Sequence, residues 1–418
     1  MKIVVKVMIL TLFTFLASVA IDQGLGFIRP GNEDRRGLLF PPHSGALYKT
    51  SEFEFSASIN SLGFRDREFN VAKGDQYRII AIGNSFTYGW GVNVEESWPK
   101  VLERNLNSEG IPVEVANLGC QGIGPKEYAD LAEKAIPLLR PDLVLIATTQ
   151  GSDLEASRPR KPEVNDNSKG GGRTNLISEV LRRIYPNTTR ITRAVSAEAT
   201  KEHPRLDAFV NEHPGLGRLI SLVVHKPSAD SEWRTQQERL LAHLNAEERK
   251  RYAQLDQAAK DAFISGGLNP ALIDAAIRQP EFFVRTFDIH KNDVQFLIDE
   301  LANHDRRIAR IAGAHKARVM VVSLPFGIYV NDRIFERWKR YGFVVDPSMR
   351  ISSWPDDAIQ VASERAGLPF LTVTAQFREH RNSELYYTLD GHLNVAGQRF
   401  YADQLTKEIA RLIRNGRG

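Results

Sequence analysis

The chain has 418 residues, of which 42% are hydrophobic and 25% are charged, a composition that can bury one large core. Its net charge of +4, from 55 basic and 51 acidic residues, is too small to indicate a nucleic-acid partner. The single cysteine, Cys120, excludes an intramolecular disulfide and a CxxC metal site, and the ten histidines show no HExxH spacing. The sequence therefore predicts no metal and no other cofactor, and it leaves the oligomeric state open.

Residues 1–24 predict an export segment. Lys2 and Lys6 flank the start of an apolar run from Val7 to Ala20, and the run ends in Ser18-Val19-Ala20, small residues of the kind that a signal peptidase reads. The run is short for a membrane span, which needs about 20 apolar residues. Two alternatives stay open, a cleaved signal peptide and a retained anchor. We expect an exported protein that is periplasmic, secreted or attached to the membrane by its N-terminus.

Residues 25–75 predict a linker followed by a small β-hairpin. The segment up to Ser44 is rich in Gly, Pro and charge, which is typical of a linker. Apolar residues then alternate weakly from Ala46 to Asn60, a pattern that favours short strands.

Strands and helices alternate over residues 76–155. The predicted strands are Tyr77–Ile82, Val113–Leu118 and Asp142–Thr148, and the third is continuously apolar, as strands in buried parallel sheets are. The predicted helices are one capped by Ser97 and one from Lys126 to Leu139 that ends before Pro141.

This alternation stops over residues 156–312, which predict a polar loop and a helical insertion. Asn245 and Glu248 form a predicted capping box, and Asn269-Pro270 predicts a further helix start. The pattern resumes over residues 313–418 with the predicted strands Arg318–Leu324 and Pro369–Val373 and a closing helix, Ala396–Ile413. Five strands alternating with helices predict an α/β fold, a doubly wound parallel sheet with a helical insertion after the third strand.

Two motifs carry the predicted chemistry. Gly83-Asn84-Ser85-Phe86 follows the first strand directly, and Asp390-Gly391-His392-Leu393-Asn394 precedes the last helix. A serine nucleophile needs a general base, and the base needs a third group that holds its tautomer. Taken alone, Asn84 and Ser85 are as well explained as helix caps.

Two further loops favour the active-site interpretation. Gly119 follows the second strand, and Gln150-Gly151-Ser152-Asp153 follows the third. Adjacent loops of a parallel sheet can supply the donors of an oxyanion hole. We therefore expect these loops to meet the serine at one edge of the sheet.

These motifs, with Asn60-Ser61-Leu62-Gly63-Phe64-Arg65-Asp66 before them, resemble the SGNH (GDSL-type) hydrolases over residues 60–155 and 317–414. The resemblance implies a flavodoxin-like five-stranded sheet, the SGNH-hydrolase fold. It also implies that Ser85 is the nucleophile, His392 the general base and Asp390 its orienting carboxylate.

The resemblance further implies an oxyanion hole formed by the backbone amides of Ser85 and Gly119. The chain departs from the family at two positions: Asn84 replaces the usual aspartate, and Ser152 replaces the usual asparagine. Because a hydroxyl reaches less far than an amide, Ser152 is expected to weaken the oxyanion hole or to act in a modified geometry.

Weaker candidates surround these positions. Asn84, Gln150 and Asp153 are possible substrate-binding groups, while Tyr88 and Trp90 are explained equally well as substrate-binding walls and as core residues. Cys120 is more simply a small packed thiol than a second nucleophile.

The sequence thus predicts a serine esterase that forms an acyl-enzyme at Ser85. Its expected substrate is an ester-bearing small molecule or an acetylated glycan, from which it removes acetyl (acyl) groups outside the cytoplasm. Two alternatives remain: a polysaccharide O-acetyltransferase with the same triad, and a non-catalytic carbohydrate-binding or assembly protein on the same scaffold.

Overall fold

The computed structural model describes residues 38–159 and 229–415, all of which belong to one compact unit. The predicted export segment, residues 1–24, and most of the predicted polar loop that follows residue 156 lie outside the described residues. Within the described ranges, no helix combines the length and the apolar character needed to cross a membrane.

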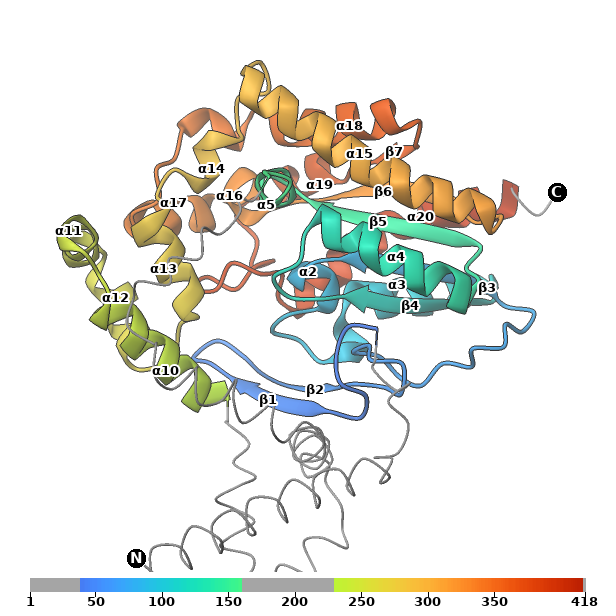
Figure 1. Ribbon diagram of the computed structural model, residues 1–418, viewed down its shortest axis with the longest axis horizontal. Helices are drawn as coiled ribbons and strands as arrows, with labels where there is room; N and C mark the ends of the chain where they lie inside the picture. The colour runs from blue at the N-terminus through green and yellow to red at the C-terminus, as the bar shows by residue number, and fades with distance from the viewer. Residues whose placement is uncertain (1–37, 160–228, 416–418) are drawn as a thin grey trace, which may run out of the picture. The chain divides into compact units, whose positions relative to one another are not determined.

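A five-stranded parallel sheet forms the centre of the unit (Figure 1). Its strands are β3 (Tyr77–Gly83), β4 (Val113–Gly119), β5 (Leu143–Thr149), β6 (Arg318–Leu324) and β7 (Phe370–Leu371). They lie in the order β4-β3-β5-β6-β7, and every neighbouring pair is parallel. This order confirms the predicted flavodoxin-like sheet. The strands that follow β3 in sequence, β4 and β5, lie on opposite sides of it, so a ligand site is expected where β3 ends.

Helices cover both faces of the sheet. α3 (Trp98–Ser108) and α20 (Val395–Asn415) pack on one face, where Ile79 and Ala81 of β3 point. α4 (Pro125–Leu139), α15 (Asn292–Ala314) and α18 (Trp354–Ala366) cover the other face, where Ile80 and Ile82 point. Alternate residues of one strand thus serve two separate cores, which explains why β3 is apolar throughout.

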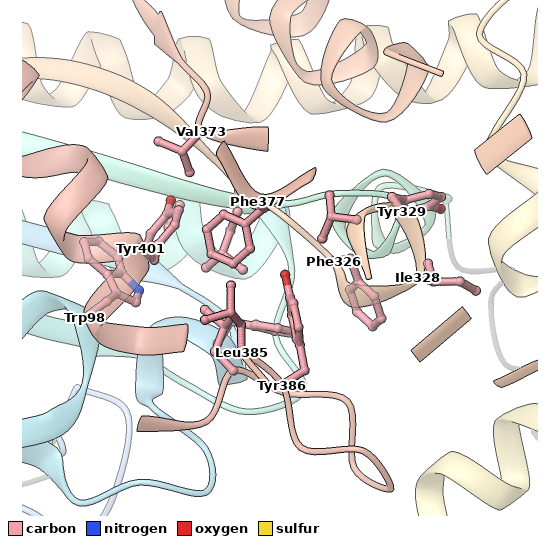
Figure 2. Packing of buried hydrophobic residues seen from close by; sticks show 14 of the residues in the cluster. Trp98, Phe326, Ile328, Tyr329, Val373, Phe377, Leu385, Tyr386 and Tyr401 are labelled. Carbon is pink, nitrogen blue, oxygen red and sulfur yellow. The ribbon is translucent and has the colours of Figure 1, made fainter. Parts of the chain in front are cut away.

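Figure 2 shows part of the core on the α3–α20 face. Trp98 and Tyr401 meet edge to face with ring centroids 5.4 Å apart. The same apolar cluster continues through Phe377 and Tyr386 to Phe326, which lies beyond the carboxyl end of β6. Buried packing therefore runs without interruption from the centre of the sheet to the edge where the predicted site lies.

The remaining elements are short. They are β1 (Gly45–Lys49), β2 (Glu54–Ser58), α2 (Ser85–Tyr88), η1 (Val94–Glu96), α5 (Ser152–Ala156), α10 (Ala229–Ala242), α11 (Ala246–Gln254), α12 (Gln257–Ile264), α13 (Pro270–Arg278), α14 (Phe282–Arg285), α16 (Gly327–Val330), α17 (Asp332–Arg340), η2 (Pro347–Arg350) and α19 (Thr374–Glu379). β1 and β2 form the predicted antiparallel hairpin. α10 packs against β1, beside the hairpin (Figure 1).

The structure corrects the predicted end of the insertion. Residues 156–312 include most of α15, yet Ile308 and Ala312 of this helix belong to the same apolar cluster as the strands. α15 also packs along α4 and α18. It is therefore a covering helix of the sheet, and among the described residues the inserted helices are α10 to α14.

Two predicted helix starts in the insertion are confirmed. Asn245 and Glu248 form a reciprocal capping box at the start of α11. The side chain of Asn269 accepts a hydrogen bond from the Ala271 N–H, with Pro270 as the first residue of α13. In contrast, the sequence analysis assigned no element between the fourth and fifth strands, where the structure has α16, α17, η2 and α18.

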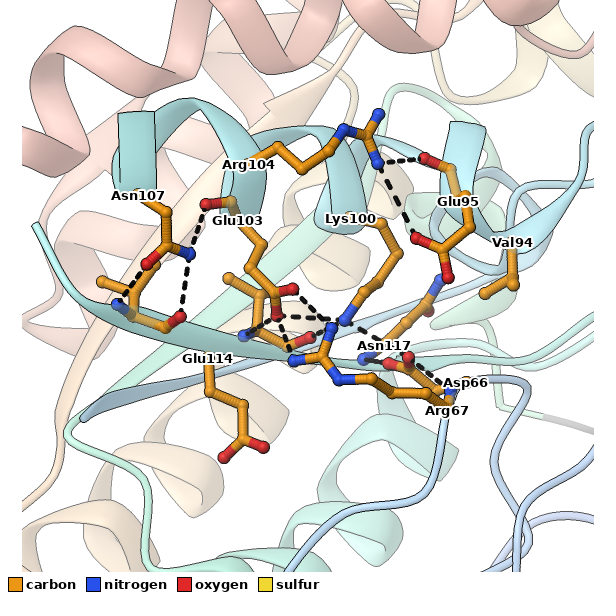
Figure 3. A network of polar contacts seen from close by, with 12 residues as sticks. Asp66, Arg67, Val94, Glu95, Lys100, Glu103, Arg104, Asn107, Glu114 and Asn117 are labelled. Carbon is orange, nitrogen blue, oxygen red and sulfur yellow. Dashed lines mark hydrogen bonds and ion pairs between the residues drawn. The ribbon is translucent and has the colours of Figure 1, made fainter. Parts of the chain in front are cut away.

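A polar network anchors the segment that precedes β3 (Figure 3). Lys100 Nζ lies 3.2 Å from Asp66 Oδ1 and 3.0 Å from Glu103 Oε2, and Arg67 also binds Glu103. Asp66 Oδ2 accepts a hydrogen bond from the Asn117 N–H of β4. Burial raises the pKa of Asp66 to about 6, against the opposing pull of Lys100. The network fixes residues 60–67 beside the strand ends.

Candidate active site

The turn after β3 presents Ser85 at the carboxyl edge of the sheet. Asn84 caps α2, because its Oδ1 accepts a hydrogen bond from the Phe86 N–H at 3.0 Å. Ser85 follows as the first helical residue and is half-buried. Gly83 must be glycine here, since a Cβ at this position would lie 2.1 Å from Thr87 Oγ1. The helix-cap and active-site interpretations of this motif are therefore compatible, because Asn84 is the cap and the Ser85 side chain can face the site.

The structure brings Ser85, His392 and Asp390 together. Ser85 Oγ lies 2.7 Å from His392 Nε2, and His392 Nδ1 contacts Asp390 Oδ1 on its other side. A carboxylate oxygen can only accept, so Nδ1 carries the proton and Nε2 is left to accept from the serine hydroxyl. The side chains of His392 and Asp390 are 18% and 7% exposed, which lets small molecules reach the imidazole but shields the carboxylate.

Three neighbours hold the loop that carries Asp390 and His392. The carboxylate of Glu52, in the turn between β1 and β2, accepts hydrogen bonds from the Leu389 N–H at 2.9 Å and the Asp390 N–H at 2.8 Å. Trp90 Nε1 donates to Asp390 Oδ2 at 3.2 Å. The hydroxyl of Tyr387 donates to the Gly91 carbonyl at 2.8 Å. The hairpin and the loop after α2 therefore both position the acid of the triad.

Glu52 was not singled out from the sequence, because an acidic residue in a hairpin turn gives no local signal of its role. Its pKa is raised, mainly because burial disfavours the charge and partly because Asp390 is negative, while the backbone N–H donors oppose the shift. Glu52 thus places a negative charge beside Asp390 and also binds two backbone N–H groups of the loop that carries it.

Arg65 holds the segment that follows Ser85. It is 1% exposed, and its guanidinium donates to the carbonyls of Tyr88 (2.8 Å), Gly89 (2.9 Å) and Val92 (2.5 Å). Its charge also stacks on the rings of Phe55 and Tyr88. The residues that resemble the family before β3 therefore support the end of α2 and make no contribution to the cavity lining.

The predicted oxyanion donors separate into two groups. Ser152, the first residue of α5, lines the same cavity as Ser85. The Gly119 amide does not fit its predicted role, since it donates to Asn117 Oδ1 at 2.9 Å. Packing explains the glycine instead: a Cβ at position 119 would lie 2.1 Å from the Tyr88 N atom. The assignment of Gly119 as an oxyanion donor is thus corrected to a close-packing role against α2.

Gln150 and Asp153 are corrected from substrate-binding to structural residues. Gln150 is fully buried and donates to Asp356 Oδ1 at 2.7 Å and to Thr374 Oγ1 at 2.8 Å. Asp153 is 1% exposed and accepts hydrogen bonds from Thr149 N–H at 2.8 Å and Asn84 Nδ2 at 3.1 Å. Burial raises the pKa of Asp153 to about 7.

Other predicted groups also take structural positions. Asn84 lines the cavity, but its side chain is engaged by Phe86, Thr149 and Asp153. The Tyr88 and Trp90 rings are buried and are absent from the cavity lining. Burial raises the pKa of the Cys120 thiol to about 11, which keeps it protonated and unsuited to nucleophilic attack at neutral pH.

A cavity of about 230 Å³ opens in front of Ser85. We call the polar lining residues Asn84, Ser85, Ser152, Asp390 and His392 the polar end of the cavity. We call the apolar lining residues that sequence analysis missed the apolar end: Ala271, Leu272 and Ala275 of α13, Phe282 and Phe283 of α14, and Phe326, Trp338 and Phe343. Phe86, Asn269 and Gly391 complete the lining. The amphipathic sequence of α13 predicted only that one face of the helix is buried. It did not predict which surface that face contacts.

Comparison with known proteins gives structural matches only. No protein-family model and no curated protein matches the chain. A structure described as a lipolytic protein of the G-D-S-L family from Desulfitobacterium hafniense is 11% identical, with a TM-score of 0.33 over 79% of this chain and 99% of that one.

Two further similar structures are described as esterases. An acetyl xylan esterase is 10% identical, with a TM-score of 0.35 over 79% of this chain and 99% of that one. An acetyl-xylooligosaccharide esterase from Geobacillus is 13% identical, with a TM-score of 0.35 over 81% and 95%.

Proposed function

We propose that this protein is a serine esterase that cleaves carboxylic esters through an acyl-enzyme at Ser85. The observation that carries the proposal is the continuous contact from Ser85 Oγ through the His392 ring to Asp390, at the mouth of a cavity. A serine that merely caps a helix has no need of an imidazole at 2.7 Å.

The first half-reaction follows from the donor and acceptor roles. His392 Nε2 takes the Ser85 hydroxyl proton while Oγ attacks the ester carbonyl carbon, and Asp390 stabilises the resulting imidazolium. When the tetrahedral intermediate collapses, the carbon–alkoxy bond breaks and the imidazolium gives its proton to the departing alcohol. The acyl group stays on Ser85.

The second half-reaction repeats these steps with water. His392 removes a proton from a water that attacks the acyl carbon, and the proton then returns to Ser85 Oγ as the carboxylic acid leaves. The backbone N–H of Ser85, at the start of α2, and the hydroxyl of Ser152 are the proposed donors to the oxyanion.

The test compares wild type with Ser85→Ala and His392→Ala on aryl esters, with Ser157→Ala as a matched control outside the cavity. We expect both triad variants to lose at least about 10⁴-fold in kcat, and Ser157→Ala to keep its rate. Equal rates in wild type and both triad variants would sink the proposal and favour the carbohydrate-binding alternative. Transfer of the acyl group to an added sugar in place of water would identify the O-acetyltransferase alternative.

The natural substrate is a further part of this proposal. An acetylated carbohydrate outside the cytoplasm is the substrate that the predicted export segment favours, and that segment lies outside the described residues. Release of acetate from an acetylated polysaccharide by wild type, and its loss in Ser85→Ala, is the measurement that decides it.

A further inference from the structure

The inserted helices build part of the apolar end of the cavity. Leu272 and Ala275 of α13 and Phe282 and Phe283 of α14 face the same space as Ser85. We propose that this recess binds the acyl part of the substrate, so that the insertion selects a medium-length alkyl chain over acetyl. The inference rests on the proposed esterase activity, and it names a longer acyl group than the acetyl that the predicted export segment favours. The chain-length profile of the enzyme decides between the two acyl groups.

The chemistry of the lining favours an alkyl chain over a sugar. Its polar residues gather around Ser85, with one exception, Asn269, whose side-chain oxygen is engaged by the Ala271 N–H. Beyond the triad the walls are aromatic rings and aliphatic side chains. A sugar placed there would bury hydroxyl groups without partners, which is unfavourable, whereas an alkyl chain gains from leaving water.

The size of the recess sets the expected chain length. At about 30 Å³ for each water-sized or methylene-sized group, a cavity of about 230 Å³ holds roughly seven such groups. Part of this space belongs to the ester group at Ser85. An acyl chain of about four to six carbons therefore fills the recess, while acetyl leaves most of it empty.

The two half-reactions assign the recess to the acyl side of the ester. The alcohol leaves and water must replace it beside His392, so the alcohol side has to stay open to solvent. The acyl chain remains attached to Ser85 through both half-reactions and gains from an enclosed apolar site. The buried rings of Phe283, Phe326 and Trp338 supply that enclosure.

The wall of the recess is packed against the catalytic loop. The ring centroid of Phe283 lies 5.0 Å from that of Trp338 and 5.4 Å from that of Phe326. Trp338 in turn occupies the space beside Gly391, where a Cβ would lie 2.3 Å from its Cζ2. The recess is thus preformed beside His392, and binding an acyl chain there requires little reorganisation.

The experiment measures kcat/KM on aryl esters of acetate, butyrate, hexanoate, octanoate and dodecanoate. For wild type we expect a rise of about fourfold for each methylene up to the length that fills the recess, then a fall. Ala275→Phe places a ring in the recess and should remove most of this rise, at least about tenfold for hexanoate, with little change for acetate. Leu272→Ala enlarges the recess and should move the optimum to a longer chain.

The matched control is Ala253→Phe, the same change at an exposed position of α11 in the same insertion. It should keep the wild-type chain-length profile, and circular dichroism and melting temperature verify that each variant folds. A flat profile in wild type, or an equal loss for all chain lengths in Ala275→Phe, would overturn the inference and leave the esterase proposal intact.

A second readout separates this inference from the esterase proposal. Binding of hexanamide and acetamide to Ser85→Ala, measured by calorimetry, needs no turnover. Tighter binding of hexanamide that is lost in the Ser85→Ala, Ala275→Phe double variant supports the recess even if wild type hydrolyses no ester. Equal binding of the two amides would contradict the recess even if esters are cleaved.

Discussion

The two ends of the cavity are built in different ways. At the polar end, the Asp390 N–H donates to Glu52, and the Asp390 carboxylate accepts hydrogen bonds from Trp90 and from the ring and backbone N–H groups of His392. At the apolar end, the side chains that α13 and α14 present to the cavity are aliphatic and aromatic and make apolar contacts only. Hydrogen-bonded geometry fails when one donor or acceptor is lost, whereas a packed wall tolerates changes of size. Substitutions at the polar end should therefore change the rate, and those at the apolar end the choice of substrate.

The largest effect is expected for Asp390→Asn. An asparagine amide would donate towards His392 Nδ1 and favour the wrong tautomer, so kcat should fall about 10⁴-fold on every ester. Steady-state kinetics across the acyl series measures it. Asp403→Asn on the exposed face of α20 is the matched control. A loss restricted to long chains would contradict the separation between the two ends.

Ser152→Ala should have the next largest effect. Removal of one oxyanion donor typically costs ~10²–10³ in kcat, and KM should change little because the donor acts on charge that develops in the transition state. Kinetics at saturating ester separates the two constants. An unchanged kcat would show that Ser152 lines the cavity without donating to the reacting oxygen.

Glu52→Gln should lower kcat about tenfold and also shift the pH profile. The carboxylate fixes two backbone N–H groups of the catalytic loop and adds negative charge near the imidazole. Burial raises the pKa of Glu52, so protonation removes this charge on the acid side of the wild-type profile of kcat against pH, and Glu52→Gln should lack that step. Glu54→Gln, on the exposed face of the same hairpin, is the control. A reduced rate with an unmoved pH profile would assign Glu52 a purely structural role.

The smallest effect on catalysis is expected for Asp305→Asn, which instead changes stability. Asp305 is 1% exposed, its Oδ2 has no hydrogen-bond partner within the described ranges, and burial raises its pKa from 3.8 to about 7. A raised folded-state pKa means that stability is fully present below pH 4 and is lost as pH rises to about 7.

Asp305→Asn should therefore match wild type near pH 4 and exceed it by on the order of 4 kcal/mol at pH 7, because the raised pKa makes the folded wild type lose stability over this whole pH range. Urea unfolding at several pH values measures this difference. A constant difference across that range would mean that the carboxyl does not titrate in the folded state.

The sequence determined the sheet and the three side chains of the triad. Apolar runs bounded by Gly and Pro located four strands to within a residue at each end and the short β7 to within two, because the period and the breakers are local properties of the chain. Ser85 was found because it directly follows a predicted strand, and His392 because it lies with Asp390 just before the closing helix.

Only the tertiary structure decided what surrounds them. Glu52 accepts a hydrogen bond from the Leu389 N–H, 337 positions away in the sequence, and the Gly119 N–H donates to the Asn117 side chain. Neither contact has a sequence signature. The inserted helices were predicted as packed elements, but an apolar helical face does not state which surface it covers. The same Ala275 could have lined a core, and the fold places it opposite the serine. The proposed catalytic residues could be predicted from local sequence motifs. The proposed selectivity for the acyl chain depends on which distant segments line the same cavity, and only the tertiary structure shows this.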